Sequence, residues 1–336
     1  MKKFNFKNLK RIFIVAEIGN NHEGNYSIAK KLVKLAAKAG VDAVKFQTFK
    51  VDEFIDQKDK KRFSQIKNFQ LNYSQFKNLK KLANKLKLKF ISTPLDFESS
   101  NFLLKNSDII KIASSDNNFF PLINYIAKKK KPTIISTGLL NLNQILSLKN
   151  RISKKISKKT IKEKISFLHC VTSYPVSDES ANLNSIKILN KKLDLIVGYS
   201  DHTIGKEACL LAASIGAKII EKHFTIDKNF SKFRDHSISS DFDELKEIVT
   251  SVRRIEKLKG IEKKIVQTCE RPFLKTVRRM PYAKKNIKVG EIISFSNTKF
   301  LRSTKSKNFF DLENIIGKKV KKVIKKNQLI IKKNLV

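Results

Sequence analysis

The sequence predicts a (β/α)8 barrel followed by a small, β-rich C-terminal domain. From residue 12 to about residue 258, short apolar runs alternate with segments that repeat apolar side chains at helical spacing. Eight such runs suit a closed barrel. Polar side chains also follow the end of every run, whereas a doubly wound open sheet, the rival fold, would concentrate them at one switch point. The barrel is therefore favoured.

The elements can be assigned in chain order. The predicted strands are residues 12–16, 42–48, 89–93, 109–113, 133–136, 165–171, 193–198 and 218–224. The predicted helices are residues 27–39, 73–86, 121–127, 142–151, 185–189, 207–215 and 242–258. The first helix ends at Gly40, a residue that commonly ends helices. A longer polar excursion separates the second strand from the helix at 73–86, and Gly198 is expected to let its strand turn.

The sequence changes character after the last predicted helix. We predict a barrel domain over residues 1–259, a linker over 260–281 and a capping domain over 282–336. The linker contains the pairs Arg271-Pro272 and Met280-Pro281. The capping domain has short apolar segments with Gly290 and Gly317 as turns. A unit this short buries little core alone, so we expect it to pack on something else.

The formal net charge of +41 raises the alternative of a basic nucleic-acid-binding protein. Lysine dominates the positive residues, arginine is scarce, and the lysines are spread over the whole length. This pattern indicates a compositional bias with lysines on solvated faces, and we expect no nucleic-acid partner. The positive field would still attract an anionic substrate.

Compartment can also be predicted from the sequence. The sequence has no run of 18 apolar residues, so we expect no membrane span. The basic N-terminus lacks the apolar core of a secretory signal. Three cysteines, Cys170, Cys209 and Cys269, suggest reduced thiols and a cytoplasmic protein. Cys170 and Cys209 lie in apolar sequence and are interpreted as packing thiols. His169 beside Cys170 should point to the opposite face of its strand, which argues against a Cys-His nucleophile.

Two histidines lie at the ends of successive predicted strands. His202 follows the seventh strand and His223 ends the eighth, so their side chains can converge on one metal ion. Imidazole suits transition metals. The alternative is a hydrogen-bonded pair of histidines without metal.

Two lysines, Lys45 and Lys111, also lie at predicted strand ends, where buried ammonium groups need a neutralising partner. Hydroxyl residues occur at other strand ends: Thr93, Ser114, Ser136 and Ser200. This group suggests a site for phosphate and carboxylate. Alternatively, each lysine pairs with a nearby Glu or Asp or points outward. Three acidic residues are candidates for hydroxyl recognition or proton transfer, or are ordinary loop residues: Glu17, Asp116 and Asp235.

Nine segments at the strand ends carry a family resemblance. They are AEIGNNHEG (16–24), VKFQ (44–47), ISTP (91–94), KIAS (111–114), STG (136–138), HC (169–170), YP (174–175), GYSDHT (198–203) and EKHF (221–224). In this order they resemble the sialic acid synthase family, enzymes that condense phosphoenolpyruvate with an N-acylated amino sugar. The segment from Tyr282 resembles the antifreeze-like domain of that family.

The resemblance implies a metal-dependent, aldol-type condensation that gives a nine-carbon sialic-acid-type sugar and phosphate by C–O cleavage. It implies a divalent metal, usually Mn²⁺ with Mg²⁺ or Co²⁺ as alternatives, held by His202 and His223, which with Glu17 form the catalytic set. The phosphoenolpyruvate residues it implies are Lys45, Thr93, Lys111, Ser114, Ser136 and Ser200. The sugar residues are Glu17, Gln47, Asp116, Tyr174, Asp235 and Arg302.

Family members are dimers in which the antifreeze-like domain of one chain caps the barrel of its partner. The resemblance therefore implies a domain-swapped homodimer in which Arg302 reaches the N-acyl group. Here Arg302 precedes Ser303-Thr304-Lys305-Ser306, where the family often has Pro-Gly. The acceptor could lead to N-acetylneuraminate, legionaminate, pseudaminate or a related sugar. A non-catalytic sugar-binding barrel is a further alternative, and His236 is either a surface residue or a sugar contact.

Overall fold

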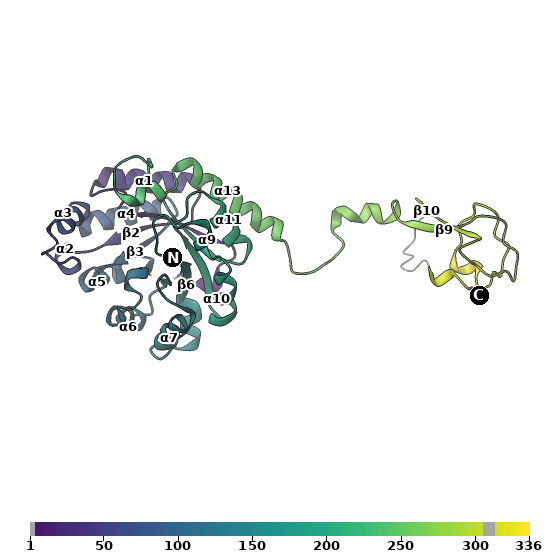
Figure 1. The fold of residues 1–336 in the computed structure, drawn as a ribbon, viewed down its shortest axis with the longest axis horizontal. Helices are drawn as coiled ribbons and strands as arrows, with labels where there is room; N and C mark the ends of the chain where they lie inside the picture. The colour runs from purple at the N-terminus through teal and green to yellow at the C-terminus, as the bar shows by residue number, and fades with distance from the viewer. Residues whose placement is uncertain (1–3, 305–312) are drawn as a thin grey trace. The chain divides into compact units, whose positions relative to one another are not determined.

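Eight parallel strands form the centre of the first of two compact units, residues 1–260 (Figure 1). The chain is seen in a computed structural model that describes residues 4–304 and 313–336. The strands are β1 (Phe13–Gly19), β2 (Ala43–Thr48), β3 (Lys89–Pro94), β4 (Ile109–Ile112), β5 (Thr133–Ser136), β6 (Ile165–Cys170), β7 (Ile196–Asp201) and β8 (Ile219–His223). Each pairs with the next, and β8 pairs with β1, which closes the barrel and confirms the predicted fold.

Helices surround the barrel, as Figure 1 shows. They include α1 (Tyr26–Ala39), α4 (Tyr73–Lys85), α5 (Phe97–Asn106), α6 (Phe120–Lys128), α7 (Leu142–Ser153), α10 (Ser185–Leu193), α11 (Glu207–Ser214) and α13 (Phe242–Lys259). Further helices are η1 (Phe6–Asn8) before β1 and, in the connections, α2 (Val51–Phe54), α3 (Lys60–Phe69), η2 (Ser114–Asp116), α8 (Lys158–Lys164), α9 (Asp178–Ala181) and α12 (Arg234–Ile238). The predictions missed α5 and gave the region of α2 and α3 only as a polar excursion.

Local sequence explains where the helices begin and end. The Asn25 side chain caps α1 by accepting from the backbone N–H of Ser27 and Ile28, and Gly40 ends the helix at φ 89°. Asp241 and Glu244 form a reciprocal capping box at the start of α13. The apolar faces of these helices pack on the outer face of the strands and form the main hydrophobic core.

The barrel interior is divided along its axis. Its amino-terminal end is filled by an apolar cluster that includes Phe6, Phe13, Ile91 and Ile219. Buried polar side chains instead gather at the carboxyl ends of the strands, among them Lys45 and Lys111. The apolar end supplies the packed core of the barrel, and the polar end is left for a functional site.

Gly198 has a different role from the predicted one. It lies inside β7, which begins and ends three residues later than predicted. A Cβ on Gly198 would lie 2.4 Å from Ile219 O and 2.6 Å from Leu168 Cδ2. The glycine is therefore needed for the close approach of β6 and β8 to β7, and the expectation that it lets the strand turn is wrong.

The second unit covers residues 261–336 and has its own small core, which includes Ala283, Ile287 and Ile293. Strands β9 (Arg279–Ala283) and β10 (Thr298–Arg302) pair antiparallel, and the described part of this unit also contains the 3-10 helices η3 (Thr268–Lys275), η4 (Glu313–Ile315) and η5 (Lys332–Asn334). The predicted linker thus contains η3 and the start of β9. Residues 305 and 306, next to the predicted capping arginine, lie outside the described residues. Among the residues that the structure describes, no helix is both long and apolar enough to cross a membrane.

Candidate active site

A cavity of about 300 Å³ opens at the carboxyl ends of the barrel strands. Thirteen of the predicted site residues line it: Glu17, Lys45, Gln47, Thr93, Lys111, Ser114, Asp116, Ser136, Tyr174, Ser200, His202, His223 and Asp235. They come from all eight strands or the loops that follow them. The barrel thus brings together residues that are more than 200 positions apart in sequence, at the end where such barrels carry their active sites.

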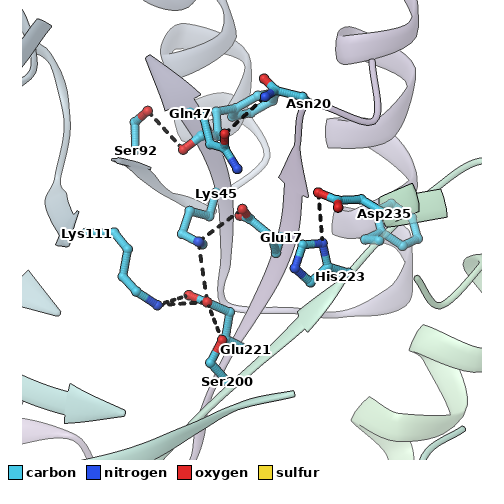
Figure 2. A network of polar contacts seen from close by, with 12 residues as sticks. Glu17, Asn20, Lys45, Gln47, Ser92, Lys111, Ser200, Glu221, His223 and Asp235 are labelled. Carbon is cyan, nitrogen blue, oxygen red and sulfur yellow. Dashed lines mark hydrogen bonds and ion pairs between the residues drawn. The ribbon is translucent and has the colours of Figure 1, made fainter. Parts of the chain in front are cut away.

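A buried network of four charged side chains forms the floor of the cavity (Figure 2). Lys111 Nζ lies 2.7 and 2.8 Å from the two carboxylate oxygens of Glu221. Lys45 Nζ lies 3.0 Å from Glu17 Oε1 and 3.3 Å from Glu221 Oε1. The Ser200 hydroxyl donates to Glu221 Oε1 at 2.8 Å. Both lysines therefore have carboxylate partners, as one of the two alternatives for these lysines foresaw, and both also border the cavity.

The two carboxylates of this network differ in their affinity for a proton. Burial raises the pKa of Glu17 to about 7, although Lys45 opposes the shift. Burial also acts to raise the pKa of Glu221, but the attraction of Lys111 and Lys45 outweighs it and holds that pKa well below its usual range. Glu17 Oε2 is buried and has no hydrogen-bond partner among the described residues. Glu221 is thus a fixed negative charge, whereas Glu17 can exchange a proton near neutral pH.

The predicted histidine pair comes together beside this network. The imidazole rings of His202 and His223 lie 5.2 Å apart between centroids. His202 Nδ1 lies 2.8 Å from Val171 O, and Tyr174 stacks on the same ring at 4.2 Å. His223 Nδ1 has no hydrogen-bond partner among the described residues and lies 3.9 Å from Asp235 Oδ2. One ring is thus held by its neighbours, while the other has a free nitrogen.

The chemistry of these two rings fits a metal ion. Burial lowers the pKa of His202 to about 4 and that of His223 well below its usual value, so both imidazoles are neutral at pH 7, the form that binds metal. A bond from His202 Nδ1–H to Val171 O leaves Nε2 as a free acceptor. Across residues 4–304 and 313–336, no group of three or more His, Cys, Asp or Glu side chains is arranged to hold a metal. The protein therefore offers two ligands at this place.

The remaining wall of the cavity is formed by residues of β2, α12 and the loops after β1 and β6. Asn20 Nδ2 donates to Gln47 Oε1 at 3.0 Å (Figure 2). The Arg234 guanidinium lies 4.6 Å over the Tyr174 ring and 3.4 Å from Asp235 Oδ1. Burial raises the pKa of Asp235. This wall offers amide, carboxyl and aromatic groups, which are suited to a polyhydroxylated substrate.

Several cavity residues were not predicted. They are Asn20, Phe54, Arg62, Ile66, Leu95, Ala113, Ser115, Thr172, Glu221, Phe233 and Arg234, together with Cys170, which was interpreted only as a packing thiol. The most important is Glu221, for which a signal existed, because it lies two positions before His223 on the same strand and therefore on the same face. Phe54, Arg62 and Ile66 come from the excursion of α2 and α3, whose helices carry no motif.

Three further sequence-based interpretations need correction or refinement. His236 is buried and lies 2.6 Å from Thr225 Oγ1 through its Nδ1, so it is neither a surface residue nor part of the cavity lining. Cys170 faces the polar cavity rather than apolar surroundings, although burial raises the pKa of its thiol. His169 points away from Cys170, as expected, and contacts Ala181 O at 2.8 Å through Nε2.

Arg302 belongs to the second compact unit. It is the last residue of β10 in the second unit, where it pairs with Arg279, and its side chain is exposed. Its predicted contact with the acyl group of a substrate stays a prediction.

Barrel and site together define a class of protein: an enzyme with buried cations, a proton-exchanging carboxyl and neutral imidazoles at the carboxyl end of a (β/α)8 barrel. Residues 32–264 match the NeuB family, and the chain belongs to that family. It is therefore a synthase-type enzyme of carbohydrate biosynthesis, which agrees with the resemblance found in the sequence.

Individual relatives agree with this membership. The chain is 38% identical to the N,N'-diacetyllegionaminic acid synthase of Campylobacter jejuni, over 96% of this chain and 99% of the relative. It is 34% identical to the pseudaminic acid synthase of the same species, over 96% of each chain. The solved structure of the sialic acid synthetase of Leptospira borgpetersenii, in complex with citrate, is 34% identical and superposes with a TM-score of 0.73, covering 79% of this chain and 90% of the other.

Proposed function

We propose that the protein condenses phosphoenolpyruvate with an N-acylated amino sugar to give a nine-carbon, sialic-acid-type sugar and inorganic phosphate. The observation that carries this proposal is the pair of buried ammonium groups of Lys45 and Lys111 at the floor of the cavity, beside the neutral pair His202 and His223. An anion holder next to a place for a metal ion is what a reaction between a phosphorylated enol and a carbonyl requires.

The lysine end of the cavity is the proposed site for phosphoenolpyruvate. Lys45 and Lys111 would bind its phosphate and carboxylate, and Thr93, Ser114, Ser136 and Ser200 would donate hydrogen bonds to the same groups. Glu221 keeps both ammonium groups in place before the substrate arrives. The lysines thus serve as preorganised cations without a Schiff base: C3 of phosphoenolpyruvate would bond to the aldehyde carbon, water would add at C2, and phosphate would leave by cleavage of its C–O bond.

The remaining wall of the cavity is the proposed site for the sugar. Gln47, Asp116, Tyr174 and Asp235 line it, and Arg302 of a second chain would reach its acyl group in a domain-swapped dimer. His202 and His223 would hold a divalent metal ion, with Mn²⁺ as the first choice and Mg²⁺ or Co²⁺ as alternatives, and substrate or water oxygens would complete its ligands. That metal would polarise the aldehyde oxygen of the open-chain sugar.

Two supporting proposals concern the setting of the reaction. The three cysteines form no disulfide, two are buried and Cys269 is exposed, which fits a protein that acts in the reducing cytoplasm. The scattered lysines and the absence of a predicted nucleic-acid motif favour the small anionic substrate over a nucleic acid as partner.

The relatives suggest the class of acceptor. We propose an acceptor of the kind used for legionaminic acid ahead of N-acetylmannosamine, because the legionaminic acid synthase, at 38% identity, is more similar to this chain than the sialic acid synthetase, at 34%. The decisive experiment measures phosphate release from phosphoenolpyruvate, in the presence of Mn²⁺, with each member of a panel of mono- and diacylated aminohexoses. Phosphate release with at least one acceptor is expected. No release with any acceptor would overturn the proposed reaction, and a preference for N-acetylmannosamine would overturn the choice of acceptor.

Glu17 is the proposed proton donor for the oxygen of the attacked aldehyde. Since the pKa of Glu17 is about 7, its protonated form dominates below that pH. We expect kcat/KM of the wild type to be highest below pH 7 and to fall as the pH rises through 7. Glu17→Gln cannot donate a proton, so kcat should fall by about 10²-fold to 10⁴-fold and this limb of the pH profile should disappear. An unchanged limb in Glu17→Gln would assign the titration to another group.

A further inference from the structure

A second buried ion pair lies behind the cavity, on the opposite face of the same two strands. Asp201 ends β7 and Lys222 precedes the last residue of β8, and the two are direct partners in the strand register. Their side chains are 0% and 1% exposed, and neither residue lines the cavity. Because side chains alternate along a strand, Ser200 and His223 face the cavity while Asp201 and Lys222 face the surrounding helices.

Both members of this ion pair also make hydrogen bonds to neighbouring groups. Lys222 Nζ lies 2.8 Å from Asp201 Oδ2 and donates to Thr203 O at 2.6 Å. Asp201 Oδ1 accepts from the Thr203 backbone N–H and hydroxyl, both at 2.8 Å, and from the Tyr199 hydroxyl at 3.0 Å. The Cys209 thiol of α11 lies 3.2 Å from Asp201 Oδ2. The pair thus ties β7, β8, α11 and the turn after β7 together.

Stabilisation of the fold is a poor explanation for the presence of a buried ion pair. Burying two charges costs so much desolvation that well-packed apolar residues often do as well or better in the same place. Buried ion pairs are better explained where they specify one arrangement. Here the arrangement concerns the two histidines, because Asp201 and Thr203 flank His202, and Lys222 directly precedes His223.

We propose that Asp201 and Lys222 are positioning residues that set the separation of His202 and His223 for the metal ion. The His202 ring is held by two contacts of its own, with the backbone oxygen of Val171 and with the Tyr174 ring. The His223 Nδ1 has no hydrogen-bond partner in the described part of the chain and lies 3.9 Å from Asp235 Oδ2, so its ring is held less firmly by side chains and depends more on the placement of its backbone. Lys222 fixes that backbone to the turn that carries His202. This inference deepens the proposed function and rests on its metal site.

The test compares Mn²⁺ binding by the full-length protein and by the double variant Asp201→Asn/Lys222→Met. The double variant removes both charges together, so it leaves no unpaired buried charge. Mn²⁺ alone is titrated by electron paramagnetic resonance of the free ion, and thermal unfolding is measured on the same samples. We expect the double variant to fold, its Kd for Mn²⁺ to rise about 10-fold to 100-fold, and the visible absorption of bound Co²⁺ to change.

Arg253→Met is the matched control. It removes the ion pair with Asp42 and the hydrogen bond to Ile12 O. These contacts connect α13 to the residues just before β2 and β1, at the end of the barrel opposite the cavity. Its melting temperature should fall while its Kd for Mn²⁺ stays at the wild-type value. A double variant that behaves like this control, with lowered stability and wild-type Mn²⁺ affinity, would reduce the ion pair to a purely structural role and overturn the proposal.

A second variant keeps the test decisive if the double variant does not fold. Thr203→Val retains the ion pair and removes one donor to Asp201, and it should raise the Kd for Mn²⁺ several-fold, whereas a wild-type Kd would overturn the inference.

Failure of the proposed reaction can be told apart from failure of the positioning role. Wild-type protein that binds Mn²⁺ but releases no phosphate refutes the proposed reaction, and the positioning role is then judged on the Kd for Mn²⁺ alone. Wild-type protein that binds neither Mn²⁺ nor Co²⁺ refutes the metal site and the positioning role together.

Discussion

Replacing His223 by alanine should remove bound Mn²⁺ and lower kcat for phosphate release by at least about 10³-fold, the equivalent of about 4 kcal/mol of transition-state stabilisation. His223 is buried, neutral and has a ring nitrogen without a hydrogen-bond partner among the described residues, so it is the side chain whose loss leaves the metal with one protein ligand. Metal content of the purified protein and phosphate release are the two measurements.

His169→Gln is the control for this prediction. His169 is also buried on a barrel strand, but its Nε2 contacts Ala181 O outside the cavity. Its substitution should leave bound metal and kcat close to the wild-type values. Full activity of metal-stripped His223→Ala would contradict the metal assignment, and normal metal content with low activity would show that His223 acts in another way.

Lys111→Met should have two separable effects. Loss of the ammonium group leaves Glu221 with Lys45 as its remaining cationic partner, so we expect the free energy of unfolding to fall by about 3–5 kcal/mol. The KM for phosphoenolpyruvate should rise by at least about 10²-fold, because a charge-assisted contact to the anion is lost. Chemical denaturation and steady-state kinetics measure the two effects independently.

The double variant Lys111→Met/Glu221→Gln separates stability from binding. It removes one cation and one anion and leaves Lys45 paired with Glu17, so most of the lost stability should return. The KM for phosphoenolpyruvate should stay high, because the anion contact is still absent. Lys80→Met, which removes a half-exposed lysine near Asp108, controls for the loss of a positive charge and should change neither quantity much. Recovery of the KM in the double variant would contradict the role of Lys111 as an anion holder.

The barrel was predictable because its strands are buried on both faces. Each strand then reads as a short apolar run, and eight runs separated by helical segments leave few other folds. The helix α5 was missed because Phe97–Asn106 mixes polar and apolar side chains with only a weak helical stripe. The boundaries of β7 were wrong because Leu193 belongs to the apolar face of α10, which an apolar run cannot distinguish from a strand.

The cavity was predictable where the strand ends carry polar residues, and less so elsewhere. Lys45, Lys111, His202 and His223 lie within or just after apolar runs, and the barrel brings the ends of these runs together. The pairing of both lysines with Glu221 depends on strand register and side-chain direction, so sequence left it as one of two alternatives. Residues such as Arg62 and Phe233 lie in the cavity because of how two long loops fold, which no local pattern encodes.

The α2–α3 excursion described above has a consequence for acceptor preference. Lys45, Lys111 and Ser200 belong to the barrel strands, whereas Phe54, Arg62 and Ile66 belong to the connection between β2 and α4. Changes in this connection can reshape the cavity wall without disturbing the ion pairs at the floor. Under the proposed function, exchanging residues 50–72 between relatives is expected to change acceptor preference while the KM for phosphoenolpyruvate stays the same.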